Sequence, residues 1–157
     1  MPDWNKVVLQ PVAAAEARPA HPSLLTSVAH VCFHVADLEQ SIHFYRDVLG
    51  LPLAFEFLDE NGKRFGIYFH AGERTFIELF ENPPQPVTGK PSYAHLCLEV
   101  ADLDAAVAAI AERGWEVGAA TLGKDGTGQA WLSDPDGNRI ELHCYTAASL
   151  QGPWLPR

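Results

Sequence analysis

Several classes of protein are excluded by what this chain of 157 residues lacks. It has no apolar run approaching the roughly 18 residues that a membrane-spanning helix needs. Its first residues lack the basic-then-apolar order of a signal peptide. Its three cysteines, an odd number, argue against a framework of disulfides and favour a reducing compartment. We therefore expect a cytoplasmic protein that does not bind a membrane.

Positive charge is also scarce. The chain has 11 Lys and Arg against 20 Asp and Glu, a formal net charge of −9, and no cluster of basic residues stands out. Nucleic acids and anionic membranes are bound through clustered positive charge, so neither is an expected partner. A small-molecule substrate, even an anionic one, needs only one or two basic side chains. Part of the negative charge can be neutralised if acidic side chains hold a divalent cation.

Three motifs of catalytic or cofactor sites are missing as well. The glycine-rich residues 123–128 lack the spacing and the strand–helix context of a phosphate-binding loop. No nucleophile elbow and no Cys-x-x-Cys pair occurs. The glycine-rich segment can still form a loop over a site, in which Lys124 or Thr127 contacts an anionic group.

The most informative feature that is present is an internal duplication. Residues 29–38, AHVCFHVADL, reappear as residues 94–103, AHLCLEVADL, and residues 76–80, FIELF, are echoed by residues 139–143, RIELH. The two offsets, 65 and 63 residues, show that the halves keep nearly one register. In each half the duplication repeats one His and one Glu, which are residue types that bind metals. They are His30 and Glu78 in the first half and His95 and Glu141 in the second.

The first half predicts the order β-α-β-β-β. From Val28 to Val35 the residue types alternate strictly, which indicates a strand with His30, Cys32 and His34 on one face. Asp37 with Gln40 three residues later is typical of a helix N-cap. The expected helix ends at Gly50, and strands are expected at Leu53–Leu58, Arg64–His70 and Thr75–Phe80. If the last two strands are joined by a four-residue loop, His70 pairs with Thr75 and points away from the face of Glu78.

The second half repeats this order after a proline-rich linker at residues 83–92. A strand is expected at His95–Val100 and a helix from Asp102 to about Gly114. Further strands are expected at Glu116–Thr121, Gln129–Ser133 and Arg139–Tyr145, with a tight turn at residues 134–137. We expect a single domain over residues 27–146 made of two modules, 27–82 and 93–146. An extension over residues 1–26 precedes it, and a tail over residues 147–157 follows.

The duplicated residues predict a metal site. A single His or Glu on a strand is more often an ordinary polar residue, but each half places a His on its first strand and a Glu on its last. These two strands are expected to be neighbours, so each His can meet its Glu. Two imidazoles and two carboxylates suit a divalent metal ion: Ni²⁺, Zn²⁺, Co²⁺ or Mn²⁺, with Fe²⁺ less favoured.

Other polar residues on these strands are candidates for contacts with a substrate. Cys32 and Cys97 follow the two histidines on the same face and are expected to line the cavity as small, apolar-like groups. His34 and Glu99 come next along the strands and face either substrate or solvent. The remaining histidines of the two halves are expected at the surface: His43, His70 and His143.

These segments resemble the vicinal oxygen chelate superfamily, which includes glyoxalase I, methylmalonyl-CoA epimerase, extradiol dioxygenases and fosfomycin-resistance proteins. The matching segments are residues 30–38, 41–51 (SIHFYRDVLGL) and 134–142 (DPDGNRIEL). The resemblance implies an α+β fold in which paired βαβββ modules form a curved mixed sheet around a metal site. It also implies a homodimer or a single chain in which modules pair, so the metal site forms either across two chains or within one.

Within the superfamily the ligand pattern is similar to that of glyoxalase I, also called lactoylglutathione lyase. Dioxygenases and fosfomycin proteins generally use three ligands, which would be His30, His95 and Glu141. Here Glu78 adds a fourth. Asn82 is similar to a residue that helps hold glutathione in that family. His34 departs from the family, because glyoxalase I usually has an Arg there for the glutathione carboxylate.

We therefore expect a metal-dependent lyase or isomerase. Proton transfer through a metal-bound enediolate would convert a 2-hydroxycarbonyl or hemithioacetal substrate, possibly a glutathione adduct, with Glu141 as the first candidate base and Glu78 as the second. Three alternatives stay open. They are an epimerase or isomerase of another 2-oxo or sugar-derived substrate, an Fe²⁺ dioxygenase of the extradiol type, and a non-catalytic binding or resistance protein.

Overall fold

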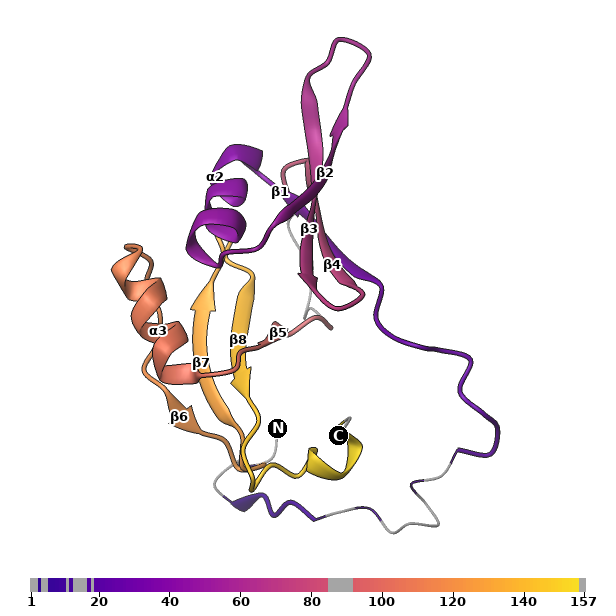
Figure 1. The fold of residues 1–157 in the computed structure, drawn as a ribbon, viewed down its shortest axis with the longest axis vertical. Helices are drawn as coiled ribbons and strands as arrows, with labels where there is room; N and C mark the ends of the chain where they lie inside the picture. The colour runs from indigo at the N-terminus through magenta and orange to yellow at the C-terminus, as the bar shows by residue number, and fades with distance from the viewer. Residues whose placement is uncertain are drawn as a thin grey trace.

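The structure is a computed structural model and describes residues 3, 6–10, 12, 17, 19–84 and 92–155. Most of the linker expected at 83–92 and much of the extension expected at 1–26 lie outside these residues. The described chain forms two similar modules, each with a four-stranded mixed sheet and helical segments on one face of it (Figure 1). This is the α+β fold of paired βαβββ units that the sequence predicts.

The first module has its strands in the order β1-β4-β3-β2, with β1 and β4 parallel and the other pairs antiparallel. The carboxylate of Asp37 accepts a hydrogen bond from the Gln40 N–H (3.0 Å), which starts the helix as predicted. Gly50, with φ 80°, ends it. The elements are β1 (His30–Val35), α2 (Leu38–Ile42), the π-helical turn η2 (His43–Val48), β2 (Leu53–Leu58), β3 (Arg64–Gly72) and β4 (Thr75–Glu81).

The second module repeats this topology in the order β5-β8-β7-β6. Asp102 caps its helix by accepting from the Ala105 N–H (3.0 Å). The elements are β5 (Leu96–Glu99), α3 (Leu103–Glu112), β6 (Thr121–Leu122), β7 (Gly128–Ser133), β8 (Arg139–Cys144) and the 3-10 turn η3 (Gly152–Trp154). No helix of the described residues is long and apolar enough to cross a membrane.

Two local predictions are wrong. The strand expected at Glu116–Thr121 begins only at Thr121, because before it the chain reaches β7 through an isolated hydrogen bond from the Gly118 N–H. In the first module His70 pairs with Phe76, not Thr75. There β3 continues to Gly72 through a bulge, which shortens the turn and places His70 on the same face as the predicted metal-binding Glu.

The core lies between the helical segments and the faces of the sheets that they cover. Alternation along each strand decides which side chains enter it. On β4, for example, Ile77 and Leu79 are fully buried, whereas Glu78 between them points to the opposite face. The helical segments contribute Ile42, Phe44, Tyr45 and Val48 in the first module and Leu103 and Ile110 in the second.

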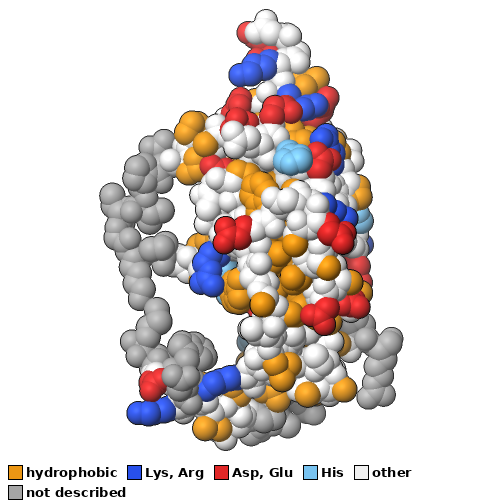
Figure 2. All heavy atoms as spheres, turned by 90° about the vertical axis from the view of Figure 1, so that its left-hand side faces the viewer, with side chains coloured by type: hydrophobic (Ala, Val, Ile, Leu, Met, Phe, Trp, Pro, Cys, Tyr) orange, Lys and Arg blue, Asp and Glu red, His pale blue; other side chains and the backbone are white. Residues whose placement is uncertain are grey.

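The two modules contact each other on the helical side. The Phe44 ring lies 4.8 Å from the Trp115 ring, centroid to centroid. The buried Tyr45 hydroxyl donates to the carboxylate of Asp134 (3.0 Å) in the β7–β8 turn. Viewed from this side, acidic, basic and hydrophobic side chains are interspersed (Figure 2). The joint between the modules therefore leaves the opposite faces of both sheets without a helical cover.

Candidate metal centre

The first module brings its predicted His–Glu pair together. Because β1 and β4 are parallel neighbours with Cys32 opposite Glu78, the side chain of His30 reaches along the same face. The Nε2 atom of His30 lies 3.5 Å from Oε2 of Glu78. The Glu78 side chain is only 13% exposed. Tyr68 on β3 stands opposite Glu78 and borders the pair.

The second module holds its pair more tightly. The Nε2 atom of His95 lies 3.0 Å from Oε2 of Glu141, whose side chain is 8% exposed. The other carboxylate oxygen, Oε1, lies 3.2 Å from Nδ1 of His143. The expectation that His143 is a surface residue is wrong, since its side chain is 12% exposed. His143 follows Glu141 by two residues on one strand, and residues two apart on a strand share a face, so the sequence contains a signal for this placement.

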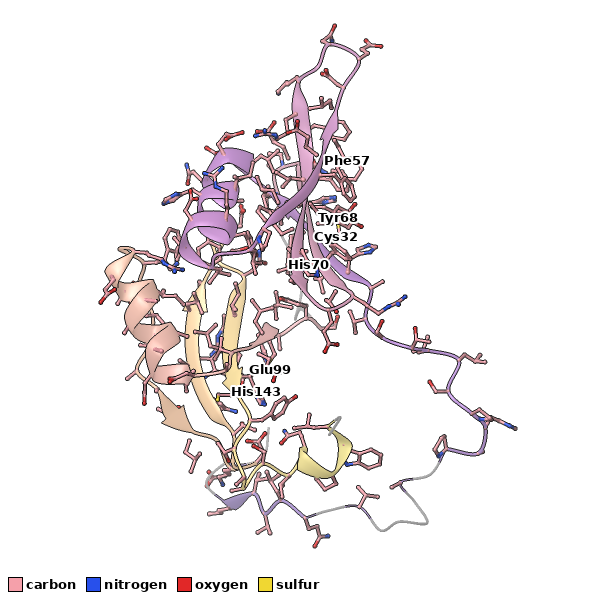
Figure 3. All side chains as sticks on the ribbon, viewed as in Figure 1. Cys32, Phe57, Tyr68, His70, Glu99 and His143 are labelled. Atoms are coloured by element: carbon pink, nitrogen blue, oxygen red, sulfur yellow. The ribbon has the colours of Figure 1, made fainter. Side chains whose placement is uncertain are left out.

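One chain keeps the two pairs apart. Among the described residues, three possible metal ligands lie close together. The ligand atoms of Cys97, Glu141 and His143 are all within 4.8 Å of one another. Figure 3 shows Cys32 and Tyr68 on the first sheet and Glu99 and His143 on the second, in two separate groups. The chain thus builds two half-sites: His30 with Glu78, and His95 with Glu141.

The chemistry of these half-sites fits a divalent cation. A carboxylate that is largely removed from water must be paired or must coordinate a metal. Within the part of the chain that the structure describes, Glu78 and Glu141 form ion pairs only with histidines, not with Lys or Arg. Neutral imidazoles and carboxylates are the ligands that zinc, nickel, cobalt and manganese accept. As ligands, the four residues remain a prediction.

Both cysteines beside the half-sites have a raised thiol pKa. Burial, followed by a hydrogen bond and repulsion from Glu78, raises the pKa of Cys32 to about 11. Partial desolvation by the surrounding protein, followed by the charge of Glu141, raises the pKa of Cys97 to about 11 as well. In the metal-free protein both groups are therefore thiols at neutral pH.

This protonation predicts slow alkylation. At pH 8, in protein freed of metal with a chelator, Cys32 and Cys97 are expected to react with iodoacetamide about 100-fold more slowly than a thiol of pKa 9.0, because only the thiolate attacks. Peptide mapping by mass spectrometry measures each rate. Glu78→Gln is expected to speed the reaction at Cys32 and leave Cys97 unchanged. Alkylation of wild-type protein at the rate of an ordinary thiol would contradict these pKa values.

The other residues that the sequence predicts to contact a substrate lie in different surroundings. His34 and Glu99 are exposed on β1 and β5. Asn82 is exposed just after β4. Lys124 donates to the backbone carbonyl of Val7 in the N-terminal extension (3.1 Å). Thr127 is fully buried, and its hydroxyl donates to the carboxylate of Asp125 (2.7 Å), so the expectation that Thr127 contacts an anionic ligand is wrong.

A continuous surface of aromatic rings adjoins the first half-site, and the sequence did not indicate it. Neighbouring ring centroids in this aromatic wall lie 4.5–6.0 Å apart. Its members are Phe55, Phe57, Tyr68, Phe76 and Phe80. The Tyr68 ring lies 5.7 Å from that of His30, so the wall ends at the predicted metal ligands. Phe55, on the edge strand β2, is 51% exposed.

The Phe80 ring lies directly over the backbone of β3. A Cβ atom at Gly66 would approach that ring to 2.4 Å. Gly66 pairs with Phe80 across the β3–β4 ladder, and the missing side chain gives the ring its room. The aromatic wall therefore depends on a glycine in the neighbouring strand.

The chain is similar to several known proteins. The chain is 32% identical over 127 residues to Metallothiol transferase FosB from Staphylococcus epidermidis, covering 78% of this chain and 84% of that protein. It is 30% identical over 125 residues to Catechol-2,3-dioxygenase from Bacillus subtilis, covering 75% of this chain but only 41% of the dioxygenase. The crystal structure of TnmS3, an antibiotic binding protein from Streptomyces sp. CB03234, superposes with a TM-score of 0.63 at 28% identity, covering 80% of this chain and all of that one.

A family match covers most of the chain. Residues 27–142 match the family described as Glyoxalase/Bleomycin resistance protein/Dioxygenase superfamily. The match includes both half-sites and both modules up to the last strand. With the duplicated fold and the relatives above, it establishes that the chain belongs to the Glyoxalase/Bleomycin resistance protein/Dioxygenase superfamily.

Proposed function

We propose that this protein is a metal-dependent lyase or isomerase similar to glyoxalase I, acting on a 2-hydroxycarbonyl or hemithioacetal substrate. Membership of the superfamily supports metal-dependent chemistry on a small molecule of the glyoxalase, dioxygenase or thiol-transferase type. The observation that favours the first type is Glu78, which contacts His30 as Glu141 contacts His95. A fourth protein ligand occupies room that oxygen and a catechol would need.

We infer further that the metal site is completed by two chains. In one chain the modules meet through the helices, and each half-site stays on an open face of its own sheet. In a homodimer His30 and Glu78 of one chain can face His95 and Glu141 of the other. The exposed aromatic side chains beside the first half-site support this, because Phe55 and Phe65 are each at least 40% exposed. Apolar groups left uncovered in this way are typical of surfaces that another chain covers.

The four ligands divide the chemistry between them. A bound divalent metal acts as a Lewis acid that makes the C–H between a carbonyl and a hydroxyl more acidic. Glu141 takes this proton and returns it to the neighbouring carbon. His95 and His143 touch the two oxygens of Glu141 and fix the orientation of the carboxylate. Glu78 keeps the second negative charge near the cation.

A panel of substrates tests the proposed reaction. Metal-free protein is loaded separately with Ni²⁺, Zn²⁺, Co²⁺ or Mn²⁺ and assayed with the hemithioacetal of methylglyoxal and glutathione, and with ketoses. The same preparations are assayed for addition of thiols to fosfomycin and, with Fe²⁺, for oxygen uptake with catechols. Isomerisation of a carbonyl substrate is expected. Thiol transfer or oxygen uptake without isomerisation would overturn the assignment in favour of the relatives' activities.

Subunit complementation tests the shared site. A chain with His30→Ala and Glu78→Ala lacks the first half-site, and a chain with Glu141→Gln lacks a working second one, so each alone is expected to be inactive. Mixed dimers contain one intact site if ligands come from both chains, so an equal mixture is expected to recover about a quarter of wild-type activity. Native mass spectrometry confirms that mixed dimers form. Mixed dimers without activity would place the site elsewhere.

A second candidate function is the binding of an aromatic compound without turnover, and the aromatic wall favours it. The relative TnmS3 is described as an antibiotic binding protein. The half-exposed Phe55 ring stacks on Tyr68, and a planar molecule can bind such a ring through offset or edge contacts. Calorimetry with planar aromatic compounds, in the presence of excess chelator, distinguishes this binding function from the proposed reaction. Tight binding without metal and recovery of the unchanged compound would favour this function over the proposed reaction.

A further inference from the structure

We propose that the second module on its own holds a thiophilic divalent cation such as Zn²⁺ through Cys97, Glu141 and His143. The ligand atoms of these three residues all lie within 4.8 Å of one another in a single chain. The site therefore needs neither the first module nor a partner chain. It is distinct from the metal site proposed above, because it uses Oε1 of Glu141 beside His143, whereas the other oxygen, Oε2, lies beside His95.

The strands hold the three residues in place. Cys97 on β5 is the direct partner of Glu141 on β8, because the two strands are parallel neighbours. His143 lies two residues further along β8, so its side chain emerges on the same face as that of Glu141. Strand β8 is flanked by β5 on one side and β7 on the other, which fixes the backbone of two of the three ligands.

The spacing suits zinc. With bonds of about 2.0–2.1 Å to nitrogen or oxygen and about 2.3 Å to one sulfur, donors around a tetrahedral zinc ion lie about 3.3–3.6 Å apart. Oε1 of Glu141 and Nδ1 of His143 are already 3.2 Å apart. Cys97 is exposed, so its side chain can rotate about χ1 to close the remaining distance of about 1 Å. A thiolate, an imidazole and a carboxylate leave one position for a fourth donor.

The first module provides an internal comparison. Cys32 and Glu78 repeat the positions of Cys97 and Glu141, but Phe80 stands where the second module has His143. Among the described residues the first module brings no three such donors within the same distance. The imidazole of His143 is therefore the group that turns one of two similar half-sites into a three-donor site.

The test uses Co²⁺ as a spectroscopic probe, because a cobalt–thiolate bond gives a charge-transfer absorption in the near ultraviolet that imidazole and carboxylate ligands do not give. Metal-free, reduced, full-length protein is titrated with Co²⁺. Wild-type protein is expected to develop this band up to one equivalent per chain. Cys97→Ser is expected to abolish it, whereas the matched variant Cys32→Ser keeps it. His143→Phe, which copies the first module, is expected to weaken Co²⁺ binding at least about 10-fold.

A further variant separates this site from the proposed catalytic site. The double variant His30→Ala, Glu78→Ala lacks the first half-site, and it is expected to lose activity but keep the thiolate band. Circular dichroism confirms that each variant is folded. Co²⁺ binding to wild-type protein without the band, a band that survives Cys97→Ser, or a band lost in the double variant would each overturn the proposal. None of these results would change the outcome of the substrate panel.

Discussion

Replacing Glu141 by Gln is expected to lower kcat by about 10²- to 10⁴-fold, the contribution that a positioned general base usually makes. The amide has the size of the carboxylate but cannot accept the proton. Both oxygens of Glu141 are in contact with histidines, at 3.0 Å and 3.2 Å, so the substitution also disturbs the ligand His95. Steady-state assays at saturating metal, with the metal content measured in parallel, separate lost proton transfer from lost metal.

The control for this experiment is Glu112→Gln, at the exposed end of α3 and remote from both half-sites. It changes the same charge and is expected to leave kcat at the wild-type value. Glu78→Gln distinguishes the two candidate bases, because the residue that takes the proton should show the larger loss in kcat at equal metal content. Wild-type activity in Glu141→Gln with metal bound would rule out Glu141 as the base.

The largest expected loss of stability comes from Asp134→Ala. The Asp134 side chain is nearly buried and accepts hydrogen bonds from the Tyr45 hydroxyl, the backbone N–H groups of Asp136 and Asn138, and the Asn138 amide. Its removal leaves several donors without partners, and each unsatisfied buried group costs about 1–3 kcal/mol. We expect a loss of at least about 3 kcal/mol in the free energy of unfolding, measured by urea denaturation at fixed protein concentration.

Two further variants each remove one hydrogen bond that crosses the joint between the modules. Tyr45→Phe removes only the bond from the Tyr45 hydroxyl to Asp134 and is expected to cost about 1–3 kcal/mol. Asp136→Ala removes only the bond to the backbone N–H of Ala36 (3.0 Å) and serves as the milder control. An Asp134→Ala protein within 1 kcal/mol of wild type would show that the buried network contributes little.

The same network predicts a pH dependence. Burial, reinforced by the charge of Asp134, raises the pKa of Tyr45 above its ordinary value of 10.0. The unfolded chain therefore releases this proton before the folded chain does. The contribution of this hydroxyl to the free energy of unfolding is fully present below pH 10 and decreases as the pH rises above 10. Tyr45→Phe should lose less stability than wild type between pH 9 and pH 11.

Much of this fold follows from local sequence signals. Asp37 and Asp102 each begin a helix by binding the backbone N–H three residues later, as the repeated motif predicts. The alternation of β1 correctly separates the core-facing Val35 from the open-faced His30. Each predicted His–Glu pair is in contact, because duplicated modules place the first strand beside the last.

Other features depend on interactions that sequence patterns do not encode. The register of His70 follows from a bulge at Gly72 and from Glu73, which adopts a positive φ of 41° that its residue type does not favour. The bond between Tyr45 and Asp134 joins positions far apart in the sequence. The position of His143 beside Glu141 is not predicted by the duplication, because the duplication identifies residues that the two halves share, and the first half has Phe80 at this position.

The contact between Gly66 and Phe80 also limits how this sequence can change over evolutionary time. Any side chain larger than hydrogen at position 66 would collide with the ring at position 80, which lies 2.4 Å from the place of its first carbon atom. A substitution at position 66 therefore requires the ring at position 80 to move or to be replaced by something smaller. We expect the two positions to covary among relatives, so that each pair of residues found there records whether a lineage has kept or lost its aromatic wall.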